Sequence, residues 1–313
     1  MKENDFKKNV VERLSQVASE HNCELLVQNV NKVNMQAIET VTFRGENIVA
    51  APTLYFDDMY KAFLSGISID EQIGRIERLL TNEPYEQFEL NISADMIKEN
   101  CFPQLISIDE NVEFLKDTPH IVVGGDMALI TRVDVGNDGS FVVKDSIIER
   151  YQLTKNELIE SAISNLEERP YELKPLYGMI ESMIGIPMEK ELDPQIMVLT
   201  STRTAYGAAE LMNRKAMAEA TALMSANEHG FFILPSSLHE VLLVPIPNGE
   251  DANVVKQSLK EMVKSVNDTT VDKTDRLSYS VYYYDPCRQS ILNADSCDLS
   301  FKESDRPHMS HHM

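Results

Sequence analysis

The chain has 313 residues, of which 43% are hydrophobic and 25% charged, so it is long enough to bury a sizeable core as one large domain or two smaller ones. Its 50 acidic residues outnumber its 29 basic ones and give a formal net charge of −21. A field of this sign repels phosphate backbones and anionic lipid, which argues against roles in nucleic-acid binding or at a membrane surface.

Two sequence features bear on the cellular compartment. No apolar run approaches the roughly eighteen residues that cross a bilayer, and the start MKENDFKKNVVERL lacks an apolar signal core. The four cysteines are scattered without C-x-x-C spacing, which argues against a zinc ribbon or a redox dithiol. We therefore expect a cytoplasmic protein with reduced thiols, and we predict no metal and no cofactor.

The first part of the chain alternates helical and extended patterns. Phe6, Val10, Leu14 and Val17 recur at helical spacing and predict an amphipathic first helix. Extended patterns follow at 24–30 and 35–43. A capping box at 68–71 then predicts a second amphipathic helix, with apolar residues at Ile73, Ile76 and Leu80.

The middle of the chain predicts short strands at 88–92, 105–108, 121–123, 127–135 and 141–143, with Asn-Asp-Gly as a hairpin turn between the last two. Gly124-Gly125-Asp126 invites comparison with the GGDEF signature of cyclic-dinucleotide synthases, but Met127 and Ala128 stand where Glu and Phe are needed. A glycine bulge that places Asp126 near a strand start explains it better. For His120 we favour a core or capping role over one as ligand or base.

A further capping box, Thr154 to Glu157, opens a helix that Pro170 stops, and residues 171–184 are predicted to be helical in part. A strand at 196–199 leads into a long predicted helix from 200 to 227. Residues Thr200 to Arg203 at its start are placed to contact a carboxylate or phosphate, with Thr202 and Arg203 as ligand-binding candidates. Because the glycine pattern of a P-loop or Rossmann turn is missing, capping by a threonine is the simpler interpretation.

The most apolar stretch is Phe231 to Pro247, FFILPSSLHEVLLVPIP, and it predicts two interior strands joined by a hydroxyl-rich turn. Ser237, His239 and Glu240 lie close together in sequence, which is one ingredient of nucleophilic catalysis. Side chains alternate along a strand, however, so His239 and Glu240 point to opposite faces if the segment is extended. We therefore favour a structural turn.

These patterns predict an α+β fold with mixed, largely antiparallel sheets covered by amphipathic helices. Two lobes are expected at 1–150 and 151–285, the second holding the strand pair, with a mobile tail at 286–313. One continuous domain is the alternative. A helix after residue 251 and a strand at 279–284 complete the second lobe.

The stretches TPHIVVGGDMALI, VLTSTRTAYGAAELM, FFILPSSLHEVLLVP and MVKSVNDTTVDKTDRLSYSVYYYD resemble an uncharacterised bacterial family catalogued as domain of unknown function 5688. The resemblance runs from the first helix to about Asp285, and ILPSSLHEV is its most specific part. It implies a bacterial, intracellular protein and brings no assigned activity, cofactor or catalytic residue.

Three functions remain in view. The first is a non-catalytic binding or regulatory module, whose partner is a protein or a small molecule. The second is a serine hydrolase, and the third an anion or small-molecule binder at Thr200–Arg203. The candidate catalytic residues are Ser236, Ser237 and His239, with Glu240 or Asp126 as the acid that orients the imidazole and His120 as a further candidate.

Overall fold

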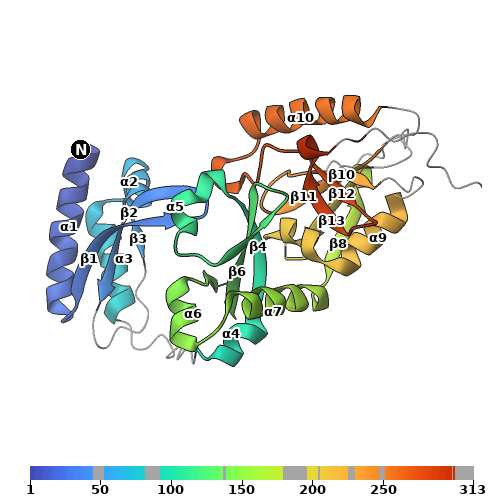
Figure 1. The fold of residues 1–313 in the computed structure, drawn as a ribbon. Helices are drawn as coiled ribbons and strands as arrows, with labels where there is room; N and C mark the ends of the chain where they lie inside the picture. The colour runs from blue at the N-terminus through green and yellow to red at the C-terminus, as the bar shows by residue number, and fades with distance from the viewer. Residues whose placement is uncertain are drawn as a thin grey trace, which may run out of the picture. The chain divides into compact units, whose positions relative to one another are not determined.

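The computed structural model describes residues 1–44, 53–81, 92–136, 139–178, 196–203, 205–224, 230–246, 251–297 and 299 (Figure 1). Contacts divide the chain into two compact units, Met1–Asn91 and Ile92–Met313. The lobe boundary expected at residues 150 and 151 lies inside the second unit, at the end of helix α6 (Asp145–Tyr151) and before helix α7 (Lys155–Glu168).

The first unit combines helices with one antiparallel sheet of order β1-β2-β3. Its elements are α1 (Glu3–Glu20), β1 (Glu24–Lys32), β2 (Met35–Arg44), β3 (Leu54–Tyr55), α2 (Phe56–Leu64) and α3 (Ile69–Thr81).

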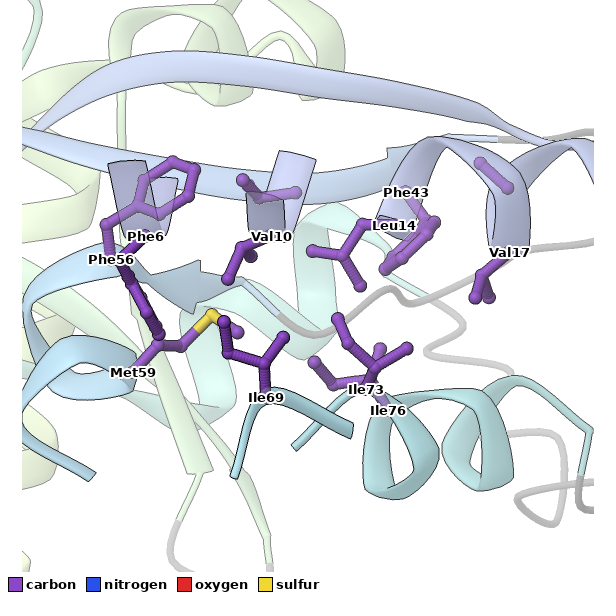
Figure 2. Close-up of a cluster of buried hydrophobic side chains, with 12 residues drawn as sticks. Phe6, Val10, Leu14, Val17, Phe43, Phe56, Met59, Ile69, Ile73 and Ile76 are labelled. Carbon is purple, nitrogen blue, oxygen red and sulfur yellow. The ribbon is translucent and has the colours of Figure 1, made fainter. Parts of the chain in front are cut away.

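The apolar stripe of α1 forms the centre of this unit's core, as its spacing predicts. Phe6, Val10 and Leu14 are fully buried, and Figure 2 shows them facing side chains of β2, α2 and α3, among them Phe56 and Ile73. Each fully buried side chain of this kind contributes roughly 1.5–3 kcal/mol to folding. The predicted helix at α3 is confirmed, and its backbone is capped at the start by the side chain of the serine at position 68.

The second unit begins with a four-stranded antiparallel sheet in the order β4-β6-β5, with β7 also paired to β6. Its elements are α4 (Ala94–Asn100), β4 (Cys101–Ser107), η1 (Asp109–Asn111), α5 (Val112–Leu115), β5 (His120–Val123), β6 (Met127–Gly136) and β7 (Gly139–Val142), followed by α6 and α7.

A six-stranded antiparallel sheet of order β13-β12-β10-β11-β9-β8 completes the second unit. Its elements are β8 (Tyr171–Pro175), β9 (Met197–Ser201), η2 (Gly207–Met212), α9 (Arg214–Met224), β10 (Phe231–Leu234), β11 (Glu240–Pro245), α10 (Ala252–Thr269), η3 (Lys273–Asp275), β12 (Tyr282–Asp285), β13 (Ser290–Asn293) and η4 (Ala294–Ser296).

The predicted strand pair lies inside this larger sheet. β10 and β11 pair antiparallel from Phe231 opposite Pro245 to Leu234 opposite Leu242, and all four residues of β10 are buried. β12 pairs with the other edge of β10, while α10 packs its buried side chains against Phe232. The α+β fold with antiparallel sheets covered by helices is therefore confirmed.

Three sequence-based expectations were wrong in part. The long helix expected from 200 is instead the end of β9, a turn, η2 and the shorter helix α9. In the segment expected to be partly helical, residues 171–175 form strand β8, residues 176–178 are helical, and residues from 179 lie outside the described part of the chain. Residues 290–296 of the expected tail form β13 and η4, and residues 298 and 300–313 lie outside the described part, as do 88–91 of a predicted strand.

Proline positions explain where two of these strands run. Pro103 lies within β4 and Pro175 ends β8, and both strands are at the edge of their sheets. Proline lacks the N–H that an interior strand must donate, so an edge is the place that tolerates it. Because β4 is an edge strand, it can include Pro103. It therefore begins at Cys101, earlier than the strand expected at 105–108.

Candidate functional site

The two serines of the central stretch hydrogen-bond within their own turn. Ser237 Oγ accepts the backbone N–H of His239 at 3.0 Å, and Ser236 Oγ donates to Glu240 Oε1 at 3.2 Å. The backbone N–H of Ser237 also donates to the Glu240 carbonyl at 3.1 Å, which closes the turn between β10 and β11. These described bonds fit a structural turn, and a nucleophilic role for either serine stays a prediction.

Both nitrogens of the His239 imidazole have partners away from these serines. Nδ1 accepts the backbone N–H of Tyr206 at 3.2 Å, and Nε2 lies 3.5 Å from Asp275 Oδ1. An acceptor at Nδ1 places the proton of a neutral ring on Nε2, where it can be donated to Asp275. The imidazole thus links the turn before η2 to η3.

Asp126 and His120 have separate surroundings. Asp126 accepts hydrogen bonds from the hydroxyls of Ser278 at 3.0 Å, Ser280 at 2.7 Å and Tyr282. His120 Nδ1 lies 2.7 Å from the carbonyl of its near neighbour Thr118. In the described contacts, Asp126 and His239 both reach the segment 275–282 but share no partner, and His120 contacts neither.

Thr202 and Arg203 line a pocket of about 790 Å³, within the size range of small-molecule sites. The pocket lies between the end of α7, the β6–β7 hairpin and the turn from β9 to η2. Its polar and aromatic lining includes Phe102, Asp134, Arg169, Arg203, Tyr206 and Glu210.

The turn from β9 to η2 shapes one wall of this pocket. Tyr206 has a φ of 58°, a left-handed conformation that ends helical continuity, and its N–H is held by His239. At Gly207 an added Cβ would lie 2.3 Å from the His239 carbonyl oxygen and 2.5 Å from the Ser201 nitrogen. A glycine is therefore required where η2 packs on β9 and β11, and Tyr206 is fixed beside the pocket.

Both predicted ligand-binding residues, Thr202 and Arg203, already have partners inside the protein. Arg203 Nη1 lies 2.5 Å from Asp134 Oδ2, and the Thr202 hydroxyl donates to the Pro170 carbonyl at 3.2 Å. Hydrogen bonding from the Gly136 N–H and then from Arg203 lowers the pKa of Asp134, which holds it as a carboxylate.

Unlike Arg203, Arg169 has guanidinium N–H donors that are available to bind a ligand. It follows α7, packs its guanidinium 5.0 Å from the centroid of the Phe102 ring and is partly buried. Across the part of the chain that the structure describes, no hydrogen bond or ion pair reaches this guanidinium. Burial, and then the nearby charge of Arg203, lower the pKa of Arg169, although arginine remains cationic.

Glu210 is the buried carboxyl of the same pocket. It is 1% exposed on η2, and its Oε2 accepts the Asn213 side-chain N–H at 2.9 Å. Burial raises the pKa of Glu210 to about 7, while the Asn213 hydrogen bond and the charge of Arg169 lower it less. A perturbed carboxyl in a cleft is a recognised mark of functional sites.

Aromatic rings supply the apolar part of the lining. The Phe102 and Tyr206 rings lie 6.0 Å apart, and Arg132 packs over Tyr206 at 5.0 Å. Arg132 is bonded to Gln104 at 3.2 Å and to the Ser140 hydroxyl at 2.9 Å, so it holds the wall rather than opening toward a ligand.

A second pocket, of about 830 Å³, lies among β5, α7, α9 and β13 and is lined mainly by aliphatic side chains. Its arginine, Arg214, is already paired with Glu167 through bonds of 2.5 and 2.9 Å. Because this cation is neutralised, the pocket with Arg169 is the stronger candidate site.

Sequence reasoning missed Arg169 and Glu210. Arg169 precedes a helix-stopping proline, which signals a chain turn without signalling a ligand. Glu210 lies in a stretch that has the composition of a helix. Among the described residues, no group of three or more His, Cys, Asp or Glu side chains is placed to hold a metal ion, and no helix there is long and apolar enough to cross a membrane.

Comparison with known proteins identifies a family match. A family model described as a family of unknown function, DUF5688, matches residues 3–286. No curated protein and no solved structure matches the chain. Because the match covers nearly the whole sequence, the chain belongs to the DUF5688 family.

Proposed function

We propose that this protein is a non-catalytic binding module that holds a small organic anion in the pocket lined by Arg169. The observation that carries the proposal is the partly buried guanidinium of Arg169, which has no hydrogen-bond or ion-pair partner among the described residues. Guanidinium offers five donors in a planar fork that matches carboxylate and phosphate groups.

The charge around Arg169 favours an anion. The two largest causes that lower the pKa of Arg169 are burial and the positive charge of Arg203. A negative ligand beside Arg169 would offset both, because it stabilises the charged guanidinium. The negative end of the α7 helix dipole, immediately before Arg169, also stabilises this cation. In a protein of net charge −21, a pocket lined by two arginines is a local exception.

The rest of the lining favours an organic ligand over a bare inorganic ion. Phe102 and Tyr206 present aromatic surface, and Leu166 adds an aliphatic side chain. Apolar walls with a few placed polar groups are typical of small-molecule pockets. The ligand class supported best is therefore an organic carboxylate or phosphate with a flat apolar part.

We further propose that binding takes place in the bacterial cytoplasm. The four cysteines are all free thiols, as expected in a reducing compartment. Localisation of a tagged copy in the native host tests this directly, and recovery in the periplasm or medium would overturn it.

A thermal-shift comparison of charged and neutral isosteres tests anion binding. Benzoate and phenyl phosphate are expected to raise the melting temperature, by an amount that grows with the logarithm of concentration once it exceeds the dissociation constant, and uncharged benzamide is not. The rise should vanish in Arg169→Gln but persist in Arg150→Gln, a matched control whose guanidinium packs over Tyr151 away from the pocket. Equal shifts with benzamide, or in Arg169→Gln, would contradict the proposal.

A further inference from the structure

Glu210 occupies an unusual position for an anion site, because this acidic residue lines the same pocket as Arg169. Glu210 is 1% exposed, and its carboxylate accepts a hydrogen bond from the side chain of Asn213. Among the described residues, no lysine, arginine or histidine nitrogen lies within ion-pair distance of its carboxylate oxygens. The pocket therefore contains a buried acid group that no cation neutralises directly.

Charged and titratable side chains surround Glu210 from several elements. Arg169 at the end of α7 acts on it most clearly, since its charge lowers the pKa of Glu210, whereas burial raises that pKa to about 7. The remaining groups facing the pocket or η2 are Asp134 and Arg132 on β6, Tyr171 on β8, Arg203 after β9, and His239 before β11.

The two ionisation states of Glu210 have opposite effects on an anion bound at Arg169. A carboxylate repels it at short range, and the repulsion is weakly screened because Glu210 is only 1% exposed. A neutral carboxylic acid removes the repulsion and offers one O–H donor. The second arrangement also satisfies a buried polar group that otherwise has few partners.

We propose that Glu210 binds the anionic ligand as a neutral carboxylic acid, so that each molecule in which Glu210 is ionised takes up a proton from solvent on binding. This inference rests on the anion site proposed above. The proton goes onto a carboxylate oxygen of Glu210, and no covalent bond to the ligand is formed.

Titration calorimetry with benzoate tests this inference, because benzoate keeps its charge across the range studied. The dissociation constant of the wild type should rise about tenfold between about pH 6 and about pH 8 if only the neutral form of Glu210 accepts the anion. Glu210→Gln carries a permanently neutral amide and should bind with the same affinity throughout. Glu160→Gln, the same substitution on an exposed part of α7, should retain the wild-type dependence.

His239 is the other titratable side chain beside Tyr206, so a variant is needed to separate its contribution from that of Glu210. His239→Gln keeps an oxygen that can accept the Tyr206 N–H, and it should retain the tenfold change. Loss of the change in His239→Gln, or its persistence in Glu210→Gln, would overturn the inference.

Proton uptake by the wild type gives a readout that does not depend on any variant folding. Near pH 7, titrations in two buffers of different ionisation enthalpy should show net uptake of roughly half a proton per benzoate bound. Binding without uptake would overturn the role of Glu210 and leave anion binding intact. Failure of benzoate to bind at any pH would overturn both for this ligand class.

Discussion

Tyr282 donates its hydroxyl hydrogen bond to the carboxylate of Asp126, which lies 156 residues earlier in the chain. The bond joins the turn between β5 and β6 to strand β12, so it connects the two sheets of the second unit. Burial, and next the charge of Asp126, raise the pKa of Tyr282 and keep its hydroxyl protonated as a donor.

Removing this hydroxyl should destabilise the second unit. We expect Tyr282→Phe to lower the free energy of unfolding by about 1–3 kcal/mol, because the partly buried carboxylate of Asp126 loses one of its donors. Tyr279→Phe removes a similar bond to Asp268 from a ring that is 42% exposed and should cost less than about 1 kcal/mol. Urea denaturation measures both, and equal losses would contradict the role given to Asp126.

Gly124 is required by the same tyrosine. A Cβ there would lie 2.6 Å from two carbons of the Tyr282 ring, whereas one at Gly125 would meet no atom within 4 Å. Their φ values are +63° and +97°, and alanine tolerates the first conformation better. Backbone strain alone therefore predicts that Gly125→Ala is worse.

We expect the reverse order for these two variants. Gly124→Ala should lose more stability than Gly125→Ala by about 1–3 kcal/mol, since the added methyl overpacks a buried ring. Thermal and urea unfolding of the two variants decide the point, and an equal or larger loss in Gly125→Ala would refute the contact argument.

Burial of Glu210 should make stability depend on pH. With its folded pKa raised to about 7, the neutral form is favoured in the folded state, while the unfolded chain ionises near its ordinary value. Stability is therefore lost as pH rises from the unfolded pKa to the folded one, and the loss is complete above about pH 8.

Glu210→Gln should remove this loss. Its stability relative to wild type should be lowest near pH 4 and should rise by at most about 3 kcal/mol by pH 8. Urea unfolding at several pH values, with Glu160→Gln as control, measures the difference. A difference that stays flat across the range would show that Glu210 is not buried as described.

The serine turn gives a prediction about chemistry. Because Ser237 Oγ accepts the His239 N–H, Ser237→Ala should cost about 1 kcal/mol of stability through the lost bond. A fluorophosphonate probe should label neither Ser236 nor Ser237. Labelling that disappears in either alanine variant would support a hydrolase and contradict a non-catalytic module.

Patterns with strong local causes could be predicted from the sequence. The strand pair around Pro235-Ser236-Ser237 follows from apolar runs bounded by proline, and the β6–β7 hairpin follows from Asn-Asp-Gly. The capping box from Thr154 to Glu157 is present, with Oγ1 accepting the Glu157 N–H at 3.2 Å. These features depend on neighbouring residues alone, so one sequence is enough to find them.

The pocket depends on contacts that one sequence does not display. The segment after residue 200 has the composition of a helix, yet contacts with His239 hold Tyr206 in a left-handed conformation and bring Gly207 against β9 and β11. The buried Asn213 then starts α9, its side-chain oxygen accepting the N–H of Lys215 at 3.0 Å. Tertiary packing overrides helix propensity in this segment, which is why Glu210 escaped prediction, whereas Arg169 precedes a proline that signals only a chain turn.

The most direct test of the account is to locate a bound anion. Crystals of the full chain soaked with 4-bromobenzoate should show an anomalous bromine peak in the pocket beside Phe102 and Tyr206, with the carboxylate on the Arg169 guanidinium. The peak should be missing from Arg169→Gln crystals. A bromine peak found only elsewhere in the wild type, or unchanged in Arg169→Gln, would contradict the claim that Arg169 binds an anion.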